Sequence, residues 1–242
     1  MSYQYGSDFY DFVDVSSGRS APLFLSCLDL GYIPETILDV GCGRGIWLKA
    51  WKNRGARVLG LDGAYVDRSS LVIEQDEFIP IDISKPFDLK CRFDLVQCLE
   101  VGEHIPEKNA DTLVSNLTRH ADVVLFSSGS PGQGGEHHVN EQPIAYWAKK
   151  FHDRGFSSFD YPRAAVQDMK EIEPWYRYNA ILYANINGQA KLSSTVKEYL
   201  VPKGGIFRVY ASFSWQLRCR IVRILPFSLV MFLAKIKHRA TV

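Results

Sequence analysis

The chain has 242 residues, and its 46% hydrophobic and 23% charged content is ordinary for a globular protein. Its five cysteines are odd in number and form no Cys-x-x-Cys pair, which argues against a disulfide scaffold or zinc ribbon and favours a reducing compartment. Residues 1–187 hold 18 Lys/Arg and 26 Asp/Glu, whereas residues 188–242 hold 10 and 1. An acidic body without a basic stripe argues against a nucleic-acid substrate. Because residues 1–18 are acidic and aromatic, no signal peptide is predicted and we expect a cytoplasmic protein.

Residues 1–35 predict an N-terminal cap that precedes the first strand. An aromatic segment over residues 2–20 is followed by an apolar stretch that predicts a helix over 21–30. Such a segment packs beside the first strand of an α/β sheet and can lie across the mouth of a site. Tyr10 and Arg19 are therefore candidates for contact with a substrate.

Residues 36–47 predict a buried strand, a glycine-rich turn and the start of a helix. Gly41, Gly43 and Gly45 allow backbone conformations that a side chain would block, so main chain can pass close to a ligand. The amides that begin the helix over 46–54 would point at whatever lies above the turn. The sequence therefore predicts a binding site here.

The spacing in this turn indicates the kind of ligand. A dinucleotide fingerprint needs a third glycine three residues after the second, whereas Gly45 follows Gly43 after two. Asp39 would repel a pyrophosphate but attract an ammonium or a hydroxyl group. These features favour a cationic nucleoside that carries no phosphate over NAD.

A second strand over residues 57–62 ends in Asp62, which lies 23 residues beyond Asp39. An acid at about this distance from a glycine turn accepts hydrogen bonds from ribose hydroxyls in nucleoside-binding α/β units. Gly63 would leave room for the nucleoside. A third strand over residues 78–81 also ends in an acid, Asp82.

Two further segments are expected at the same rim, because ligands lie outside the carboxyl ends of parallel strands. The first follows a strand over residues 93–99, and the second is the long glycine-rich loop 128–143 after a strand over 122–127. The residues of these two segments that could take part in catalysis or ligand binding are Glu100, Glu103, His104, His137 and His138.

Strands over residues 156–161 and 178–186 would complete the sheet with an antiparallel edge. The expected fold class is α/β, a Rossmann-like, doubly wound sheet of seven mainly parallel strands, with a basic helical C-terminal tail. The domain is expected to span 1–187 and the tail 188–242.

The pattern D-x-G-x-G-x-G at residues 39–45 resembles motif I of the class I S-adenosylmethionine-dependent methyltransferases. The resemblance extends over residues 8–187. Within the class I methyltransferases, the sequence is similar to a small group associated with glycan and polysaccharide assembly. It depends on five further blocks, which are residues 62–68, 99–105, 131–135 (Pro-Gly-Gln-Gly-Gly), 138–143 (His-Val-Asn-Glu-Gln-Pro) and 146–147. Two positions depart from the group: a glutamine is usual where Tyr178 stands, and the residue at 137 varies.

The resemblance implies that S-adenosylmethionine is bound and S-adenosylhomocysteine is the product. In the methyltransferase pattern the third-strand acid, here Asp82, accepts from the adenine amino group, and Ile83 packs on the ring. The implied cofactor-binding residues are Asp39, Gly41, Cys42, Gly43, Asp62, Gly63, Asp82, Ile83 and Glu100.

The expected reaction is O-methylation of a sugar hydroxyl, with His138 as general base and Glu103 or Glu100 orienting an imidazole. His137 and His104 complete the candidate catalytic set. Asn140 and Gln142 are expected to bind acceptor hydroxyls, and candidates for lining the acceptor pocket are Tyr10, Arg19, Tyr65, Trp175 and Tyr176.

Three alternatives remain open at this point. The chain could N-methylate an amino sugar or another small amine, or bind S-adenosylmethionine without catalysis. The histidines and glutamates could also gather around a divalent metal ion, although no spacing fixes a ligand geometry and no metal is expected.

The tail is apolar and basic over residues 205–242. Its apolar run 227–234 is too short to span a bilayer. The pattern predicts either a peripheral membrane contact or a helical pair that packs on the domain or mediates dimerisation.

Overall fold

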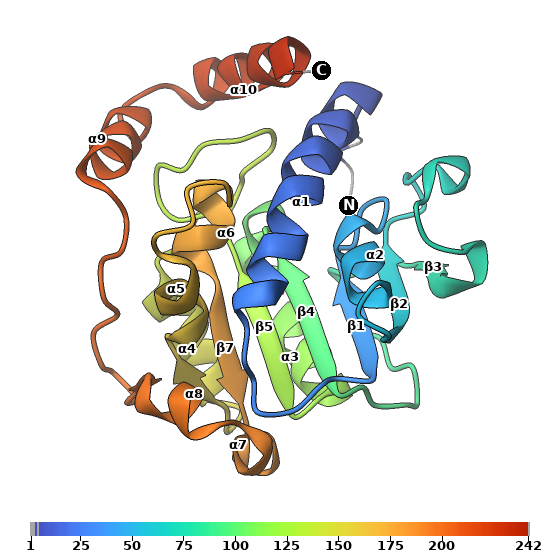
Figure 1. Ribbon diagram of the computed structural model, residues 1–242. Helices are drawn as coiled ribbons and strands as arrows, with labels where there is room; N and C mark the ends of the chain where they lie inside the picture. Colours follow the sequence, from blue (N-terminus) through green and yellow to red (C-terminus); the bar gives the residue numbers. More distant parts are fainter. Residues whose placement is uncertain (1–2, 4, 242) are drawn as a thin grey trace.

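The computed structural model describes residue 3 and residues 5–241. A single mixed sheet runs through the molecule in the order β3-β2-β1-β4-β5-β7-β6-β8 (Figure 1). The strands are β1 Thr36–Val40, β2 Arg57–Asp62, β3 Phe78–Pro80, β4 Leu95–Leu99, β5 Val123–Ser127, β6 Ser157–Phe159, β7 Ile181–Ala184 and β8 Leu200–Val201.

The first five strands pair in parallel, and β7 is antiparallel to both β5 and β6. The prediction of seven strands is wrong, because β8 adds an eighth. It pairs antiparallel with β6 through Leu200 opposite Phe159. A strand of two residues shows no alternation that could reveal it in the sequence.

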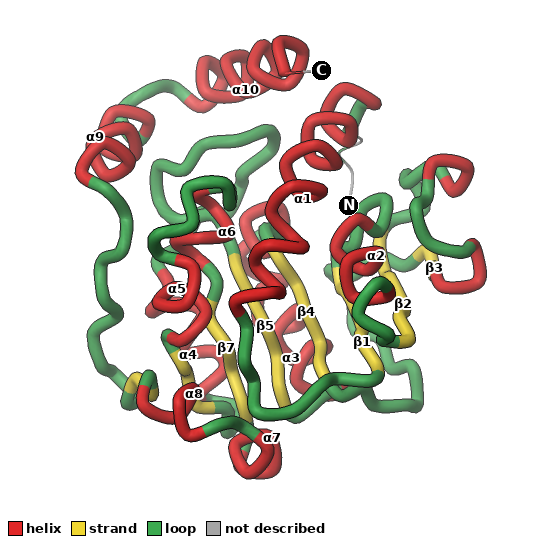
Figure 2. Tube along the Cα trace, viewed as in Figure 1, coloured by secondary structure: helices red, strands yellow, loops and turns green. Residues whose placement is uncertain are grey.

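Helices cover both faces of the sheet, as predicted for a doubly wound fold (Figures 1 and 2). They are α1 Ser7–Cys27, α2 Ile46–Lys52, α3 Ala110–His120, α4 Ile144–His152, α5 Tyr161–Val166, α6 Pro174–Asn179, α7 Ile186–Lys191, α8 Ser194–Glu198, α9 Phe213–Val222 and α10 Phe227–Thr241. Consecutive residues of β1 point to opposite faces. Ile37 joins the core beneath α1 and α2, and Leu38 joins the core beneath α3 and α4.

The predicted starts of the first helix and of the last strand differ from the structure. One helix runs from Ser7 to Cys27 through Gly18 and Pro22, whereas the sequence predicted a start at residue 21. Packing of its buried face against the sheet overrides the weak local propensity of a glycine and a proline. Tyr178, predicted to begin the last strand, lies instead in α6.

The tail crosses the molecule and ends above the carboxyl edge of the sheet. After β8 the chain runs without regular structure to α9, and α10 packs against α1 (Figure 1). In residues 3 and 5–241, no helix combines the length and apolar character needed to cross a bilayer.

Candidate functional site

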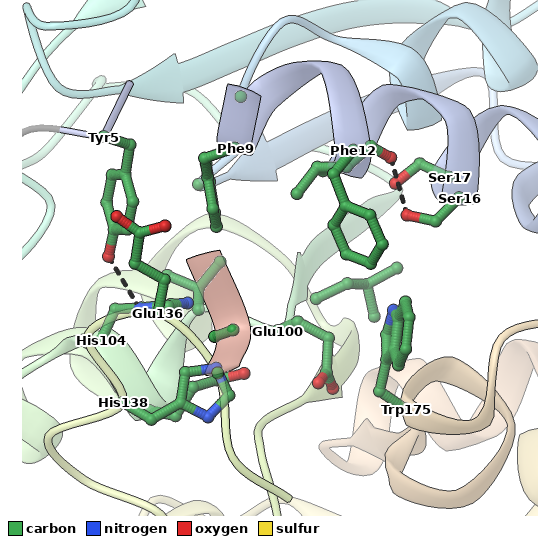
Figure 3. A pocket seen from close by; sticks show the side chains of 18 of the residues that line it. Tyr5, Phe9, Phe12, Ser16, Ser17, Glu100, His104, Glu136, His138 and Trp175 are labelled. Atoms are coloured by element: carbon green, nitrogen blue, oxygen red, sulfur yellow. Dashed lines mark hydrogen bonds between the residues drawn. The ribbon is translucent and has the colours of Figure 1, made fainter. Parts of the chain in front are cut away.

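A cavity of about 460 Å³ lies at the carboxyl ends of β1, β2 and β4 (Figure 3). Its walls come from α1, the loop 128–143 and the two tail helices as well as from the sheet. The predicted site residues that line it are Tyr10, Asp39, Gly41, Cys42, Gly43, Asp62, Tyr65, Ile83, Glu100, Glu103, His104, His138, Trp175 and Tyr176.

The glycine-rich turn has the backbone that the sequence predicted. Gly41, Gly43 and Gly45 have φ values of 88°, 54° and 90°. A Cβ on Gly41 would lie 2.3 Å from a methyl group of Val101, whereas a Cβ on Gly43 would meet only the Tyr10 ring, at 3.9 Å. The main chain at Gly43 therefore borders open cavity, as a close approach to a ligand requires.

Asp62 ends β2 and accepts three hydrogen bonds. Its Oδ2 accepts from the amide of Gly43 at 2.8 Å, and its Oδ1 accepts from the amide of Gly63 at 2.6 Å and from the Tyr65 hydroxyl at 2.8 Å. Burial raises the pKa of this carboxyl, and the two amide bonds oppose the rise. Gly63 holds Asp62 in position but does not line the cavity.

Asp39 is 3% exposed and forms one end of a buried polar chain. The Gln97 amide donates to Asp39 Oδ2 at 2.9 Å, and the Trp51 indole donates to the oxygen of the same amide at 2.8 Å. Burial raises the pKa of Asp39 to about 7, against the effect of the Gln97 bond. A cationic ligand would favour the ionised form of this carboxyl.

Glu100 follows β4 with a left-handed backbone, at φ 56°. Its carboxylate accepts from the side-chain amide of Gln133 at 2.6 Å and from that of Asn179 at 3.3 Å. Burial raises the pKa of Glu100, and these bonds oppose the rise. The residue therefore ties the loop 128–143 to β4 and α6.

Glu103 and His104 lie in the short helical turn Gly102–His104. Both carboxylate oxygens of Glu103 are buried and make no hydrogen bond within the described residues. Burial, and then the nearby Glu100, raise the pKa of Glu103 well above its usual range. The Nδ1 of His104 lies 2.8 Å from the Tyr5 hydroxyl, and burial holds the pKa of this imidazole well below its usual range.

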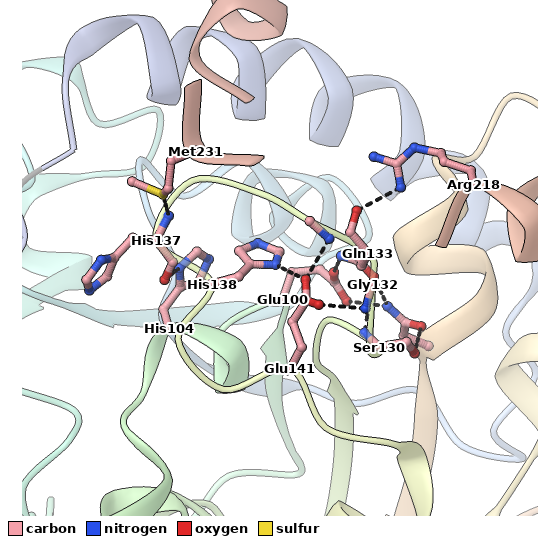
Figure 4. A network of polar contacts seen from close by, with 12 residues as sticks. Glu100, His104, Ser130, Gly132, Gln133, His137, His138, Glu141, Arg218 and Met231 are labelled. Atoms are coloured by element: carbon pink, nitrogen blue, oxygen red, sulfur yellow. Dashed lines mark hydrogen bonds and ion pairs between the residues drawn. The ribbon is translucent and has the colours of Figure 1, made fainter. Parts of the chain in front are cut away.

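The loop 128–143 folds around Glu141 (Figure 4). Its carboxylate accepts from the amide of Gly132 at 2.7 Å and from the amide of Gly134 at 2.6 Å. The Nδ1 of His138 donates to the same carboxylate at 2.8 Å. This bond leaves Nε2 of His138 as the nitrogen that can accept a proton.

One group of possible metal ligands occurs within the described residues. Glu103, His104 and His138 each place one donor atom within 4.8 Å of the others. Two imidazoles and a carboxylate suit an ion such as Zn²⁺. The same three residues can equally serve a proton transfer, because their donor atoms border the cavity.

Besides Gly63, two predicted site residues from the body lie outside the cavity lining. Asp82 accepts hydrogen bonds from the amide and hydroxyl of Ser84, at 3.1 and 2.6 Å, and so stabilises the turn after β3. Arg19 points outward from α1 and forms an ion pair with Glu173. The roles predicted for both residues stay predictions.

Three predicted site residues of the loop 128–143, His137, Asn140 and Gln142, also lie outside the lining. Asn140 is buried, donates to the carbonyl of Gly102 at 3.4 Å and accepts from Gln142 at 3.1 Å. The imidazole of His137 stacks on Tyr3, with ring centroids 4.2 Å apart. These contacts anchor the loop to the turn after β4 and to the N-terminal segment.

Several cavity residues were not predicted from the sequence. Tyr5, Phe9 and Phe12 come from the aromatic N-terminal segment, whose composition indicated packing but not a position. From the tail, Arg218 donates to the carbonyl of Gln133 at 2.7 Å. The ammonium of Lys237 lies 4.8 Å above the Phe12 ring and 4.9 Å above the Trp175 ring.

One region of the chain matches a known protein family. Residues 21–128 match the family model described as "Methyltransferase domain". A ubiquinone biosynthesis O-methyltransferase of Acinetobacter baylyi is 34% identical over 130 residues, which are 44% of this chain and 55% of the relative. The enzyme of the same name from Pseudomonas fluorescens SBW25 is 32% identical over 123 residues, or 46% and 47% of the two chains. The chain thus spans about half the length of these curated relatives.

Two solved structures share the fold at low identity. An O-methyltransferase family protein from Burkholderia thailandensis superposes with a TM-score of 0.53 at 13% identity, over 73% of this chain and 59% of that one. Human N-acetylserotonin methyltransferase, solved with S-adenosylmethionine, gives 0.50 at 16% identity, over 73% and 55%. Residues 21–128 thus match a methyltransferase domain, and the chain shares the α/β fold of these two solved methyltransferases.

Proposed function

We propose that the protein is an S-adenosylmethionine-dependent O-methyltransferase. One observation carries this proposal: the cavity beside Gly43 and Asp62 is continuous with the one bordered by Glu103 and His138. A single space therefore offers a nucleoside cradle at one end and the imidazole of His138, which can accept a proton, at the other. S-Adenosylmethionine supplies an electrophilic methyl group from its sulfonium centre when it is bound.

The cradle suits a nucleoside that carries a positive charge. Asp62 offers oxygens to ribose hydroxyls, and Asp39 offers a carboxylate to an ammonium group. The open approach at Gly43 lets main chain contact the ligand. Ile83 lines the same cavity and offers an apolar surface for the adenine ring of the donor.

His138 is the proposed general base. Its Nδ1 proton is held by Glu141, so the lone pair on Nε2 can take the proton of an acceptor hydroxyl as the oxygen forms its bond to the methyl carbon. The carbon–sulfur bond breaks in the same displacement and leaves a neutral sulfide. Glu103, which has a raised pKa, keeps the cluster close to neutral.

The acceptor is proposed to carry both a hydroxyl group and an apolar part. The cavity wall away from the sheet is formed by aromatic and aliphatic side chains of α1, α9 and α10, among them Phe12, Val222 and Val230. The curated relatives are named for ubiquinone biosynthesis, which supports an acceptor of this kind. A sugar hydroxyl, as the motif resemblance implies, fits if the sugar is joined to an apolar group.

The first experiment separates binding from chemistry. Calorimetry with the full chain should give heat for S-adenosylmethionine and S-adenosylhomocysteine but none for NAD. Labelled donor is then supplied with free sugars, sugar nucleotides, lipid-linked saccharides, alkylated phenols and matched amines, and products are read by mass. Methylation of amines alone, or binding without turnover on any acceptor, would contradict O-methylation.

The second experiment tests the base. His138→Gln should lower turnover at saturating substrate by about a hundredfold or more, with little change in donor affinity. His152→Gln is the control, because that imidazole contacts Ser158 at 2.9 Å, away from the cavity. Turnover by the His138 variant close to that of the control would remove His138 from the mechanism.

A further inference from the structure

The outward side of α9 is an apolar stripe. Phe213, Leu217 and Ile221 recur at intervals of four residues, which places them on one face of the helix, and Ile224 follows in the turn after it. All four are exposed, Ile224 to 81%. Nothing in the described part of the chain covers this stripe.

The helix α10 is apolar on two sides. Val230 and Ala234 line the cavity from its inner side. On the outer side Leu229, Phe232 and Ile236 are exposed, at spacings of three and four residues. A helix that is apolar on both sides needs a partner on both, and the domain supplies only one of them. The two outer stripes together are called the outer tail face.

The charge of this region restricts the partner. Residues 199–242 hold eight Lys/Arg and no Asp or Glu. Arg220 and Arg223 are exposed, and neither forms an ion pair within the described residues. A second copy meeting the same face would bring like charges together, which disfavours a symmetric dimer. A surface that is negatively charged and apolar beneath its charges is complementary.

We propose that the outer tail face docks on an anionic lipid bilayer, with α9 and α10 lying in the interface rather than crossing it. Basic side chains would reach the headgroups while phenylalanine and aliphatic side chains enter the acyl boundary. The inner sides of the same helices line the cavity. Docking therefore places the cavity wall formed by α9 and α10 next to the membrane. An acceptor dissolved in the bilayer then has a short path to His138. Docking itself depends on the surface and not on the proposed reaction.

Vesicle flotation with the full chain tests the docking. The protein should float with vesicles of phosphatidylcholine containing 30% phosphatidylglycerol and remain unbound with phosphatidylcholine alone. Raising NaCl from 50 to 500 mM should weaken the binding, because salt screens the attraction between arginines and headgroups. Equal binding to both lipid compositions, or none to either, would overturn the proposal.

Two paired substitutions separate the apolar and the charged contributions. Ile224→Glu with Phe232→Glu should abolish flotation, since acidic groups on the stripes oppose insertion. Arg220→Gln with Arg223→Gln should weaken binding to anionic vesicles by about 25-fold, as two neutralised charges at about fivefold each. The matched controls are Ile33→Glu, an apolar position of the body that is 82% exposed, and Lys108→Gln with Lys170→Gln.

The flotation results can be interpreted in this way only if the variants stay folded. Unchanged circular dichroism and unchanged affinity for S-adenosylhomocysteine establish that, and they test the proposed cofactor separately from the membrane. Sedimentation of the lipid-free chain gives the remaining outcome. A dimer that Ile224→Glu with Phe232→Glu dissociates, combined with no flotation, would assign the outer tail face to self-association instead.

Discussion

The hydroxyl of Tyr65 donates to Oδ1 of Asp62 at 2.8 Å, so the side chain occupies an oxygen that a ribose hydroxyl would use. Cofactor binding must displace this bond or share the oxygen. Tyr65→Phe should therefore tighten binding of S-adenosylhomocysteine by about fivefold, the equivalent of one net hydrogen bond of about 1 kcal/mol. Calorimetry measures the change. Tyr32→Phe, whose hydroxyl bonds the Asp94 carbonyl elsewhere, should leave the affinity unaltered; weaker binding by the Tyr65 variant would mean that its hydroxyl assists the ligand.

Donor affinity should depend on pH through Asp39, whose pKa is raised to about 7 by burial. Below pH 7 the carboxyl is protonated and neutral, and above it the carboxylate attracts the ammonium group of the donor. Affinity should therefore rise from pH 6 to pH 7, by up to about tenfold per unit, and level off near pH 8. His104 stays neutral throughout because its pKa is well below its usual range. In Asp39→Asn the affinity should be lower and flat over this window; a slope that persists in the variant would assign the titration to another group.

Because Gly135 has no side chain, there is room beside Nε2 of His138, the proposed base. A Cβ at this position would lie 2.2 Å from Nε2 of His138. Gly135→Ala should force the imidazole to rotate away from Glu141 and reduce turnover to the level of His138→Gln, with donor affinity retained. Gly18→Ala is the control, because a Cβ there meets no atom within 4 Å. Normal turnover in the Gly135 variant would show that Nε2 does not act.

Added Zn²⁺ should inhibit the proposed methyl transfer. An ion held by Glu103, His104 and His138 would take the lone pair that the acceptor proton needs. Micromolar Zn²⁺ should lower turnover, and a chelator should restore it without affecting the untreated enzyme. His104→Asn should reduce the sensitivity to Zn²⁺. Loss of activity on chelation alone would instead make the metal a participant.

The parts of the site that follow from the sequence are local in the chain. Gly41 and Gly43 adopt positive φ as predicted, because a strand that turns directly into a helix needs such residues there. Asp62 borders the cavity because it ends a strand next to β1, and parallel strands bring their carboxyl ends to one edge. Periodicity and motif spacing contain this information.

The parts that could not be predicted depend on distant contacts. Asn140 and Gln142 belong to a motif that suggested acceptor binding, yet in the structure they hydrogen-bond each other, and Asn140 bonds the backbone after β4. Lys237 reaches the cavity only because α10 packs across α1. An amphipathic pattern indicates that a helix needs a partner but does not name the surface that it covers.

Intrinsic tryptophan fluorescence should report on occupancy of the cavity. Three of the five tryptophans line it, and these are Trp47, Trp175 and Trp215. Indole emission depends on the polarity and mobility of its surroundings, so occupancy of the cavity should alter the intrinsic fluorescence without any attached dye. Because Trp215 comes from α9 and Trp47 from α2, single replacements by phenylalanine would distinguish a signal from the acceptor end from one that arises beside the glycine turn.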